Sequence, residues 1–489
     1  MIKFKKTNGG FLLVQVLVFA TVAALILTAL VGWAGINIQG ARHSLYREQE
    51  FQIAEAGIEY YRWHLAHAPA DYKDGTNSAG PYVHNYYDKD NNLIGQFSLD
   101  IVAPPTGSTK VVVRSKGTVT ADPGSYRRIE VQFAKPSIAK YAAVSNAIIY
   151  YGGGDEVWGP IHSNQGVGFF SGNPQPKAHN TVTSAVSTFN DVNGKHFGVY
   201  TSVPNADPTP PAVVPSRPDV FMGGRQFPVP AVDFSGMTTD LNTLKTAAQA
   251  SGFYRAGSGG SGYQVTLKTN GTFDLYKVTS LMAAPGTGAS ACSNTSGEAN
   301  WGTWSVNAKT LLGNYAFPSN GILFFEDHVW VEGQINGARI TVVAATFPVN
   351  AATYRNIIVN NNLLYTKFDG TDTIGLIAQG NFQIGLFSAD NLTIDAAIVA
   401  QNGATYRQYY RPASGGRNYC SPNAVRASLT TYGMFATNAQ AYFLQNSASG
   451  QSGYLSQPAS YDTNLLYSPP PTFPLLSDQY ITLYWQEIK

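Results

Sequence analysis

Two adjacent carboxylate pairs are the residues of this chain whose types could support chemistry. Asp155 precedes Glu156, and Glu326 precedes Asp327. A pair of carboxylates can cleave a glycosidic bond or bind calcium. Neighbouring residues on a strand point to opposite faces, however, so neither pair converges on one ligand by itself.

The other candidates for chemistry give weaker signals. His162 and His328 are isolated and form no H-E-x-x-H pattern. Residues 151–155 are glycine-rich but lack the Gly-Lys-Ser/Thr ending of a phosphate-binding loop, and we expect a turn there. A C-x-x-C spacing would indicate a zinc site or a redox dithiol, and Cys292 and Cys420 do not have it. We therefore expect no enzyme activity, no metal and no cofactor.

Composition narrows the class of protein. A chain of 489 residues with 44% hydrophobic residues can bury a sizeable core, and its length suggests about two to four domains. Its 32 basic and 30 acidic residues give a net charge of +2, so we predict no nucleic-acid partner. Few charges and many Gly, Tyr, Asn and Ser residues are typical of an extracellular β-rich protein. Outside the cytoplasm Cys292 and Cys420 could form a disulfide, and both the bonded and the free state stay open.

The N-terminal region carries a long apolar run. Residues 11–38 are interrupted only by a few small or uncharged polar side chains, and as a helix they would span about 42 Å, more than the roughly 30 Å hydrocarbon core of a membrane. Three interpretations compete: a secretory signal peptide, an ordinary signal anchor and a prepilin-type segment. A signal peptide has a shorter apolar core with its cleavage site behind it. Here a small residue, Gly10, precedes the run and follows a basic leader that contains Lys3, Lys5 and Lys6.

The order of basic leader, Gly10, Phe11 and apolar helix resembles the type IV pilin and pseudopilin family. In that family the leader is cut after glycine and the mature chain usually begins with Phe. The resemblance implies cleavage between Gly10 and Phe11, with a prepilin peptidase, the membrane and other pilin-like subunits as partners. It also implies a single pass through the bacterial cytoplasmic membrane with the N-terminus in the cytoplasm, and later a place in the pilus or at the cell surface.

One position departs from the family pattern. The fifth mature residue is usually Glu, whose buried carboxylate pairs with the N-terminal amine of a neighbouring subunit, and here that position is Gln15. Gln cannot form this ion pair. Either the segment is an anchor that never enters a filament, or the chain is a minor subunit at the filament tip.

A helix and a small sheet are predicted for residues 11–135. One helical stripe beyond the membrane carries Phe51, Ala54, Ile58, Tyr61 and Leu65. Pro69 is expected to end the helix. Residues 96–102 and 128–133 alternate between apolar and polar side chains, and residues 110–120 are rich in valine, which predicts three antiparallel strands. A long helix with an antiparallel sheet on its C-terminal half is the pilin architecture.

The rest of the chain is larger than a pilin and rich in short β-type runs. In 136–200 and 321–489 these runs are separated by Gly and Asn, a pattern typical of the stacked coils of a parallel β-solenoid. We favour this fold, and a β-sandwich stays open. Segments 329–344 and 373–403 weakly resemble bacterial surface proteins with such coils. Residues 480–485 are expected to cap an open edge of the solenoid.

Residues 201–320 interrupt the β-rich region. Prolines between 204 and 230 predict an extended linker, and residues 239–251 predict a short helix with one apolar face. Asn270 and Gly271 predict a tight hairpin turn. The fold class is therefore α+β: a transmembrane helix with a pilin-like sheet, followed by a mainly-β domain with a small α+β insertion.

Two functions follow from this reading. The first is a minor pilin-like structural subunit that displays its β-domain outside the cell, for assembly initiation or for adhesion to a surface glycan or host ligand. The second is a membrane-anchored protein that binds or cleaves carbohydrate. A mature chain that begins at Phe11 and is found in sheared filaments would favour the first function.

Overall fold

The computed structural model describes residues 9–104, 108–170, 172–234, 237–294, 297–298, 300–466, 468–477 and 479–489. The basic leader residues Lys3, Lys5 and Lys6 lie outside the described residues. The chain forms two compact units. The first comprises Met1–Ala103, Val111–Phe133 and Thr482–Lys489, and the second comprises Pro104–Lys110 and Ala134–Ile481.

A single long helix and one sheet make up the first unit. The helix is α1 (Gly9–His67), and the sheet has the strand order β1-β2-β3-β4-β33. Its strands are β1 (Tyr82–Tyr87), β2 (Leu93–Val102), β3 (Val111–Val119), β4 (Asp122–Ala134) and β33 (Ile481–Ile488). The first four strands pair antiparallel, and they contain the three strands that the sequence predicts. The predicted helix end is also confirmed, because α1 stops two residues before Pro69.

The C-terminal half of α1 packs on this sheet through the predicted stripe. Ala54, Ile58, Tyr61 and Leu65 are at most 3% exposed. Helix and sheet approach closely at Gly117 of β3, where a Cβ atom would lie 2.0 Å from the Glu50 carbonyl oxygen. The period of the stripe therefore predicts correctly which face of α1 is buried.

The last strand of the chain belongs to this sheet. β33 follows β4 in the sheet order, although more than 340 residues separate them. Glu487 of β33 accepts two hydrogen bonds from the Arg127 guanidinium, each 2.6 Å long, and the Trp485 ring lies 5.9 Å from the Phe51 ring of α1. The sequence predicts residues 480–485 over an open edge of the solenoid, whereas the structure places Ile481–Ile488 in this sheet. In this sheet Trp485 gains the ring contact and Glu487 gains the ion pair.

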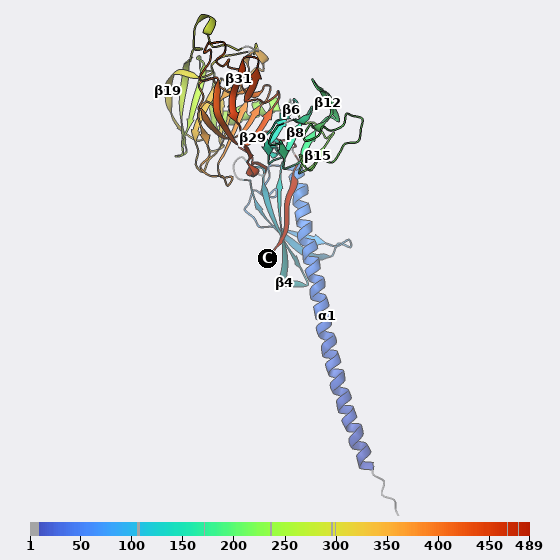
Figure 1. Ribbon diagram of the computed structural model, residues 1–489. Coiled ribbons are helices and arrows are strands. Elements are labelled where there is room, and N and C mark those ends of the chain that lie inside the picture. Colours follow the sequence, from blue (N-terminus) through green and yellow to red (C-terminus); the bar gives the residue numbers. More distant parts are fainter. Residues whose placement is uncertain are drawn as a thin grey trace, which may run out of the picture. The chain divides into compact units, whose positions relative to one another are not determined.

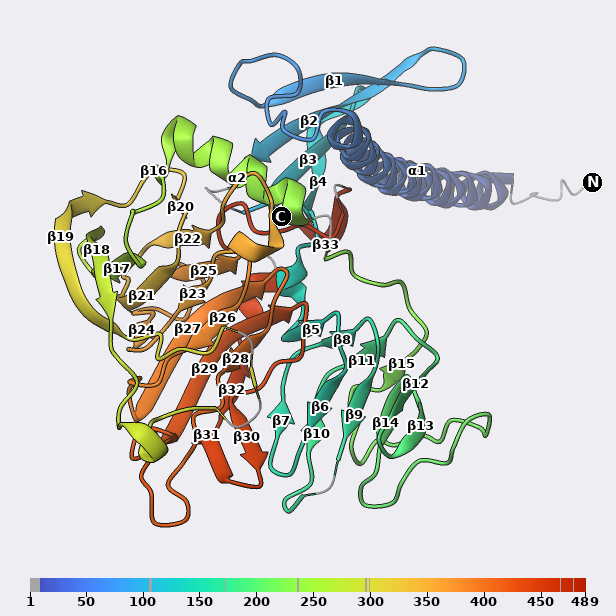
Figure 2. The same cartoon turned by 90° about the horizontal axis from the view of Figure 1, so that it is seen from above.

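Parallel strands stack into one long wall of the second unit. Every neighbouring pair in this wall is parallel. In spatial order the strands are β16 (Phe253–Arg255), β20 (Ile322–Phe325), β22 (Arg339–Ala344), β25 (Thr373–Ala378), β27 (Asn391–Ala400), β29 (Val425–Thr437), β5 (Ala143–Ser145), β8 (Ile161–Ser163), β11 (Val182–Ser184) and β15 (Arg225–Gln226). Figure 2 shows these strands side by side. Such coil-on-coil parallel pairing is the arrangement of a β-solenoid.

The chain enters this stack in its middle. It starts at β5, runs outward to β15, and then begins again at the opposite end with β16. From there it winds back to β29, which pairs with β5 through Phe435 and Ala143, Ala436 and Val144, and Thr437 and Ser145. The two β-rich regions of the sequence thus form one continuous stack.

Shorter parallel walls complete the coils. One contains β17 (Gly262–Leu267), β21 (Val329–Gln334), β23 (Ile357–Ile358), β26 (Phe382–Ile384) and β28 (Thr405–Arg407). β24 (Leu363–Leu364) pairs with β21 and β27, and β31 (Gly450–Ser456) and β32 (Ala459–Tyr461) pair with β29. A further wall contains β6 (Ile149–Tyr151), β9 (Val167–Phe169) and β14 (Val199–Thr201). β7 (Glu156–Val157) pairs with β10 (Lys177–Ala178).

Antiparallel hairpins extend from these coils. β17 continues into β18 (Thr272–Leu281) and β19 (Val306–Ala316), with the predicted turn at Asn270 and Gly271. β12 (Thr188–Asp191) pairs with β13 (Gly194–Phe197), and β30 (Leu444–Ser447) pairs with β31. Because β16 and β17 pair in parallel with β20 and β21, the α+β insertion also supplies the terminal coil of the stack.

Both faces of the long wall are buried near the insertion. Leu323 and Phe325 of β20 point into the solenoid core, whereas Ile322 and Phe324 belong to a second cluster on the outer face. That outer cluster is covered by α2 (Met237–Ser251), whose Leu241, Leu244 and Ala248 are at most 2% exposed. Burial on both faces explains why β20 is apolar throughout rather than alternating. It also confirms the helix that the sequence predicts over 239–251.

The two ends of the second unit are held together. Ile138 donates its backbone N–H to Pro474, and Leu476 donates to Pro136, at 3.0 and 2.8 Å. Ser137 forms an isolated bridge with Leu475. Adjacent ends are typical of a domain inserted into another fold.

The second unit should therefore fold as an isolated fragment of residues 134–481, soluble and rich in β-structure by circular dichroism. A fragment that starts at residue 142 lacks Ile138 and Ala139, which are 1% and 0% exposed, and the Ala139 carbonyl that accepts the Tyr461 hydroxyl at 2.8 Å. We expect it to be less stable by about 2–4 kcal/mol in urea titrations. Insolubility of the longer fragment, or a mainly helical spectrum, would contradict this domain boundary.

Candidate functional site

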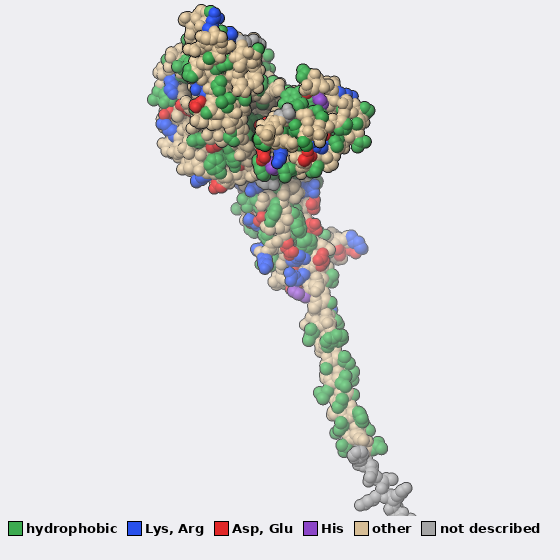
Figure 3. Space-filling model, in the orientation of Figure 1, with side chains coloured by type: hydrophobic (Ala, Val, Ile, Leu, Met, Phe, Trp, Pro, Cys, Tyr) green, Lys and Arg blue, Asp and Glu red, His purple; other side chains and the backbone are tan. Residues whose placement is uncertain are grey.

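The first half of α1 is an apolar surface that the described residues of the chain leave uncovered. Its large apolar side chains between Leu12 and Ile38 are 46–73% exposed, and Figure 3 shows them along the free part of the helix. Among the described residues, α1 is the one helix that is long and apolar enough to cross a membrane. In Figure 1 the sheet covers only the other half of α1. Lipid or other apolar helices are the environments that suit such a surface.

The expected cleavage site lies at the start of this helix. α1 begins at Gly9, so Gly10 and Phe11 are in its first turn. Gln15 follows about one turn later and is exposed. Cleavage after Gly10 and the role of Gln15 stay predictions, and they are taken up below.

The carboxylate pair at 326–327 does not converge. Glu326 accepts hydrogen bonds from Lys245 and the Tyr254 hydroxyl at 2.6 and 2.7 Å. Asp327 accepts from the backbone N–H and the hydroxyl of Ser258 at 2.8 and 2.6 Å. Each carboxylate thus fixes a different neighbouring segment.

The pair at 155–156 is also divided between two structural contacts. Asp155 accepts the Gly152 N–H at 2.7 Å within the glycine-rich turn, and burial raises the pKa of this carboxyl. Glu156 contacts His179 at 3.2 Å. The structure therefore brings neither predicted pair together around a common point.

The two isolated histidines are held within the fold. His162 contacts the Thr183 hydroxyl at 2.9 Å and the Asn164 side-chain oxygen at 3.0 Å, and burial lowers its pKa. His328 accepts the Asn356 N–H on Nδ1 at 3.0 Å, and burial lowers its pKa to about 4. In the part of the chain that the structure describes, no three His, Cys, Asp or Glu side chains gather to hold a metal ion.

Cys292 and Cys420 are joined in a disulfide, with their Cα atoms 4.5 Å apart. The bond lies in a small buried cluster with Leu386 and Tyr410. Next to it, Arg411 donates its backbone N–H to the Ser293 carbonyl at 3.1 Å. The disulfide therefore ties the loop before β19 to the loop before β29.

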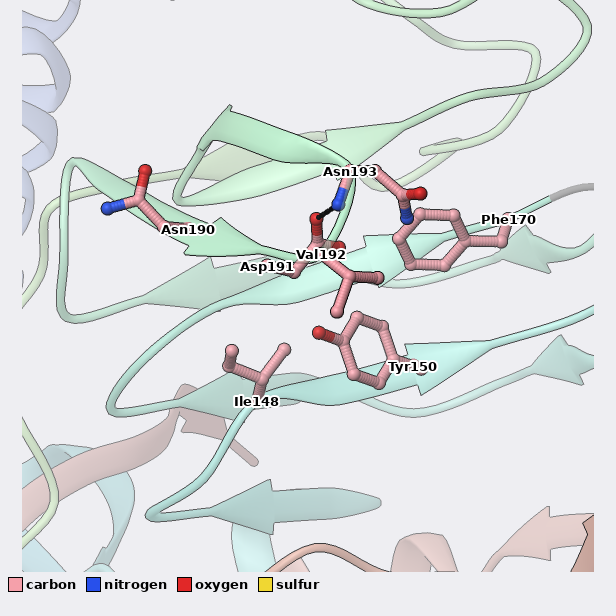
Figure 4. A pocket seen from close by; sticks show the side chains of 7 residues that line it. All are labelled: Ile148, Tyr150, Phe170, Asn190, Asp191, Val192 and Asn193. Carbon is pink, nitrogen blue, oxygen red and sulfur yellow. Dashed lines mark hydrogen bonds between the residues drawn. The ribbon is translucent and has the colours of Figure 1, made fainter.

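A groove in the first part of the solenoid was not found by sequence reasoning. It has a volume of about 560 Å³ and is lined by Ile148, Tyr150, Phe170, Asn190, Asp191, Val192 and Asn193. Figure 4 shows these side chains, which come from β6, the end of β9 and the β12–β13 hairpin. No motif marks them in the sequence, since parallel pairing alone brings these separated segments together.

Gly168 sets the shape of the groove floor. Tyr150, Gly168 and Tyr200 are directly paired across β6, β9 and β14, so they share one face of the sheet. A Cβ atom at Gly168 would lie 2.5 Å from the Phe170 ring and 3.2 Å from the Tyr150 ring. The absence of a side chain at Gly168 thus lets the Phe170 ring lie between the two tyrosines, 5.2 Å from Tyr150 and 5.9 Å from Tyr200.

The β12–β13 hairpin forms the polar wall of the groove. Asp191 Oδ1 accepts the Asn193 N–H at 2.7 Å and contacts His196 Nε2 at 3.0 Å, which fixes the two-residue turn. Burial raises the pKa of the Tyr150 hydroxyl, and the Asp191 carboxylate raises it further. Tyr150 therefore remains a hydrogen-bond donor at neutral pH.

A buried carboxyl on β27 makes stability depend on pH. Asp395 is 4% exposed and accepts the Tyr365 N–H at 2.9 Å. Burial, with a smaller contribution from the Asp462 carboxylate, raises the pKa of Asp395 from 3.8 to about 6. The folded state therefore holds this proton to a higher pH than the unfolded state does.

Between about pH 4 and pH 6 the wild-type chain should thus lose stability as pH rises, relative to Asp395→Asn. The amide of Asn can still accept the Tyr365 N–H but never ionises. Above pH 6 the free energy of unfolding of the wild type should have fallen by about 3 kcal/mol relative to that of Asp395→Asn, at 1.36 kcal/mol per pKa unit. Urea unfolding of both chains at several pH values measures it, and parallel pH profiles would show that Asp395 does not titrate in this way.

The chain is similar to a solved structure. This is the crystal structure of the competence-associated pilin ComZ from Thermus thermophilus, matched at 15% sequence identity and a TM-score of 0.32, over 91% of this chain and 97% of that chain. No protein-family model matches this chain, and no curated protein does. In the first unit, α1 is exposed and apolar in its first half and packs on the sheet in its second half.

Proposed function

We propose that this chain is a minor type IV pilin-like subunit that carries a β-solenoid domain on a pilin-like base. After removal of residues 1–10, the apolar half of α1 enters a filament, and the solenoid is displayed outside the cell. The subunit then serves initiation of filament assembly or adhesion. The observation that carries this proposal is the uncovered apolar half of α1 next to a half that packs on the sheet.

The energy of burial supports the proposal. Each large apolar side chain in 12–38 would gain ~1.5–3 kcal/mol on leaving water. A membrane supplies this environment before assembly, and the helices of neighbouring subunits supply it within a filament. A prepilin peptidase is the partner that would release the mature helix.

The connectivity of the second unit supports a low copy number. The chain leaves the pilin-like sheet after β4 and returns to it as β33, so the solenoid is an insertion of over 340 residues within that sheet. A domain of this size is hard to accommodate at every step of a closely packed helical filament.

Gln15 supports a position at the end of the filament. In the apolar core of a filament, a carboxylate is tolerated when it meets the amine of a neighbouring subunit. A subunit with Gln15 offers its own amine at Phe11 but no carboxylate. It therefore lacks the ion pair that its carboxylate would form with a neighbour's amine. Only a subunit at the end of the filament has no such neighbour.

Immunogold labelling with an antibody against residues 134–481 tests the location. We expect sparse label at filament ends, and filaments from cells that lack this chain serve as the control. Dense label along the whole shaft would contradict the inference from Gln15.

A second function is favoured by the aromatic groove. The chain could be a carbohydrate-binding protein that stays anchored in the membrane by α1. The rings of Tyr150 and Phe170 would then contact the sugar. Full-length chain that remains in the membrane, together with saccharide binding, would favour this alternative. The carboxylate pairs at 155–156 and 326–327 give no support to carbohydrate cleavage, because each carboxylate has separate partners.

A further inference from the structure

We propose that the groove between the β6–β9–β14 wall and the β12–β13 hairpin binds a neutral oligosaccharide. This inference gives the adhesion role of the proposed function a class of ligand, and it rests on display of the solenoid outside the cell. It starts from the floor of the groove. Tyr150 is 38% exposed, and the neighbouring Phe170 ring is partly exposed at 5.2 Å between ring centroids.

Exposed rings of this kind suit one face of a sugar. The C–H groups on the apolar face of a pyranose carry partial positive charge, and the face of an aromatic ring is negative. A flat ring surface therefore stacks on a sugar without needing charge. Gly168 makes this surface possible because any Cβ there would collide with the Phe170 ring.

Polar groups of the hairpin stand where sugar hydroxyls need partners. Asn193 is exposed at the rim and lies on the Phe170 side of the groove in Figure 4, whereas the Asn190 amide points away from the two rings. The Tyr150 hydroxyl can donate and accept. Asp191 holds the turn through the Asn193 N–H and His196, so the wall is fixed before a ligand arrives. A few fixed polar groups around an apolar floor are what a specific small-ligand site requires.

The charge of the groove distinguishes a sugar from a nucleic acid. Nucleic-acid bases also stack on aromatic rings, but their binding depends on Lys and Arg beside the phosphates. None of the seven lining residues is basic, and the one charged residue, Asp191, is negative. A neutral saccharide meets no repulsion there, whereas a phosphate backbone would.

Binding of cellohexaose, chitohexaose and maltohexaose to the full chain in detergent, measured by isothermal titration, tests this site. We expect at least one of the three to bind, and Tyr150→Ala to weaken that binding at least tenfold. Trp158→Ala is the matched control: this ring is 59% exposed in the same part of the solenoid but does not line the groove, so binding should stay within twofold. Asn193→Ala, at the exposed turn, should weaken binding without affecting the fold.

Three results would overturn the proposal. The first is that none of the three saccharides binds. The second is that Tyr150→Ala and Asn193→Ala both bind a saccharide as tightly as the wild type does. The third is that a short single-stranded oligothymidylate binds to the wild type and competes for the groove. Because this assay needs no filament, its outcome is independent of where the subunit is located in the cell.

Discussion

A chain with Gly10→Leu should keep its first ten residues and never appear at the cell surface in filaments. In the proposed function the leader passes through the site of a peptidase that cuts after a small residue, and the side chain of leucine would block that passage. Intact-mass measurement of the membrane-bound chain should then give the full-length mass, and no N-terminus at Phe11 should be found. We expect processing to fall to background, the largest effect of any single substitution considered for this chain.

Gly10→Ala is the matched control for this experiment, because alanine is also small and should still be cut. Processing lost in both variants would show that the substitutions disturb more than side-chain size. Normal processing and surface display of Gly10→Leu would remove the pilin hypothesis.

Removing the disulfide should lower the free energy of unfolding of the solenoid by about 3–5 kcal/mol. Cys292 and Cys420 close a loop with a sequence separation of 128, and a cross-link over such a loop removes entropy from the unfolded chain. We would replace both residues by alanine, since both are at most 4% exposed in an apolar cluster. Urea unfolding of the oxidised wild type and of the double variant in detergent, followed by tryptophan fluorescence, measures the change.

The wild-type chain after reduction is the control for the disulfide experiment. It keeps both sulfur atoms but lacks the cross-link, so its unfolding midpoint should match that of the double variant. If the oxidised wild type and the double variant unfold at the same urea concentration, the disulfide contributes nothing to stability.

Sequence reasoning identified the buried face of those elements that have one buried and one exposed face. Ala54, Ile58 and Tyr61 recur at helical spacing because only one stripe of α1 meets the sheet. β2 alternates between buried and exposed residues for the same reason. α2 was predicted through the same kind of stripe, which packs on β20.

The order of the coils could not be predicted from the sequence. Most strands of the solenoid are short and buried on both faces, so they show no alternation that would fix a partner or a register. β5 pairs with β29 although about 290 residues separate Val144 from Ala436. The strand β33 was missed for a similar reason, because its partner β4 is remote in the sequence.

The residues of the aromatic groove could not be predicted from the sequence either. Tyr150, Gly168 and Tyr200 become neighbours only through the parallel register of β6, β9 and β14. In the sequence they are isolated residues among many other aromatics and glycines. The expected cleavage position, by contrast, rests on a local pattern around Gly10, so it can be predicted without any structure.

The mass of the chain in sheared surface filaments tests the central claim most directly. If this protein is a pilin-like subunit, the filament fraction should contain a chain that begins at Phe11 and extends to Lys489, with the first ten residues removed. A chain that is found only in the membrane fraction and still begins at Met1 would contradict that claim.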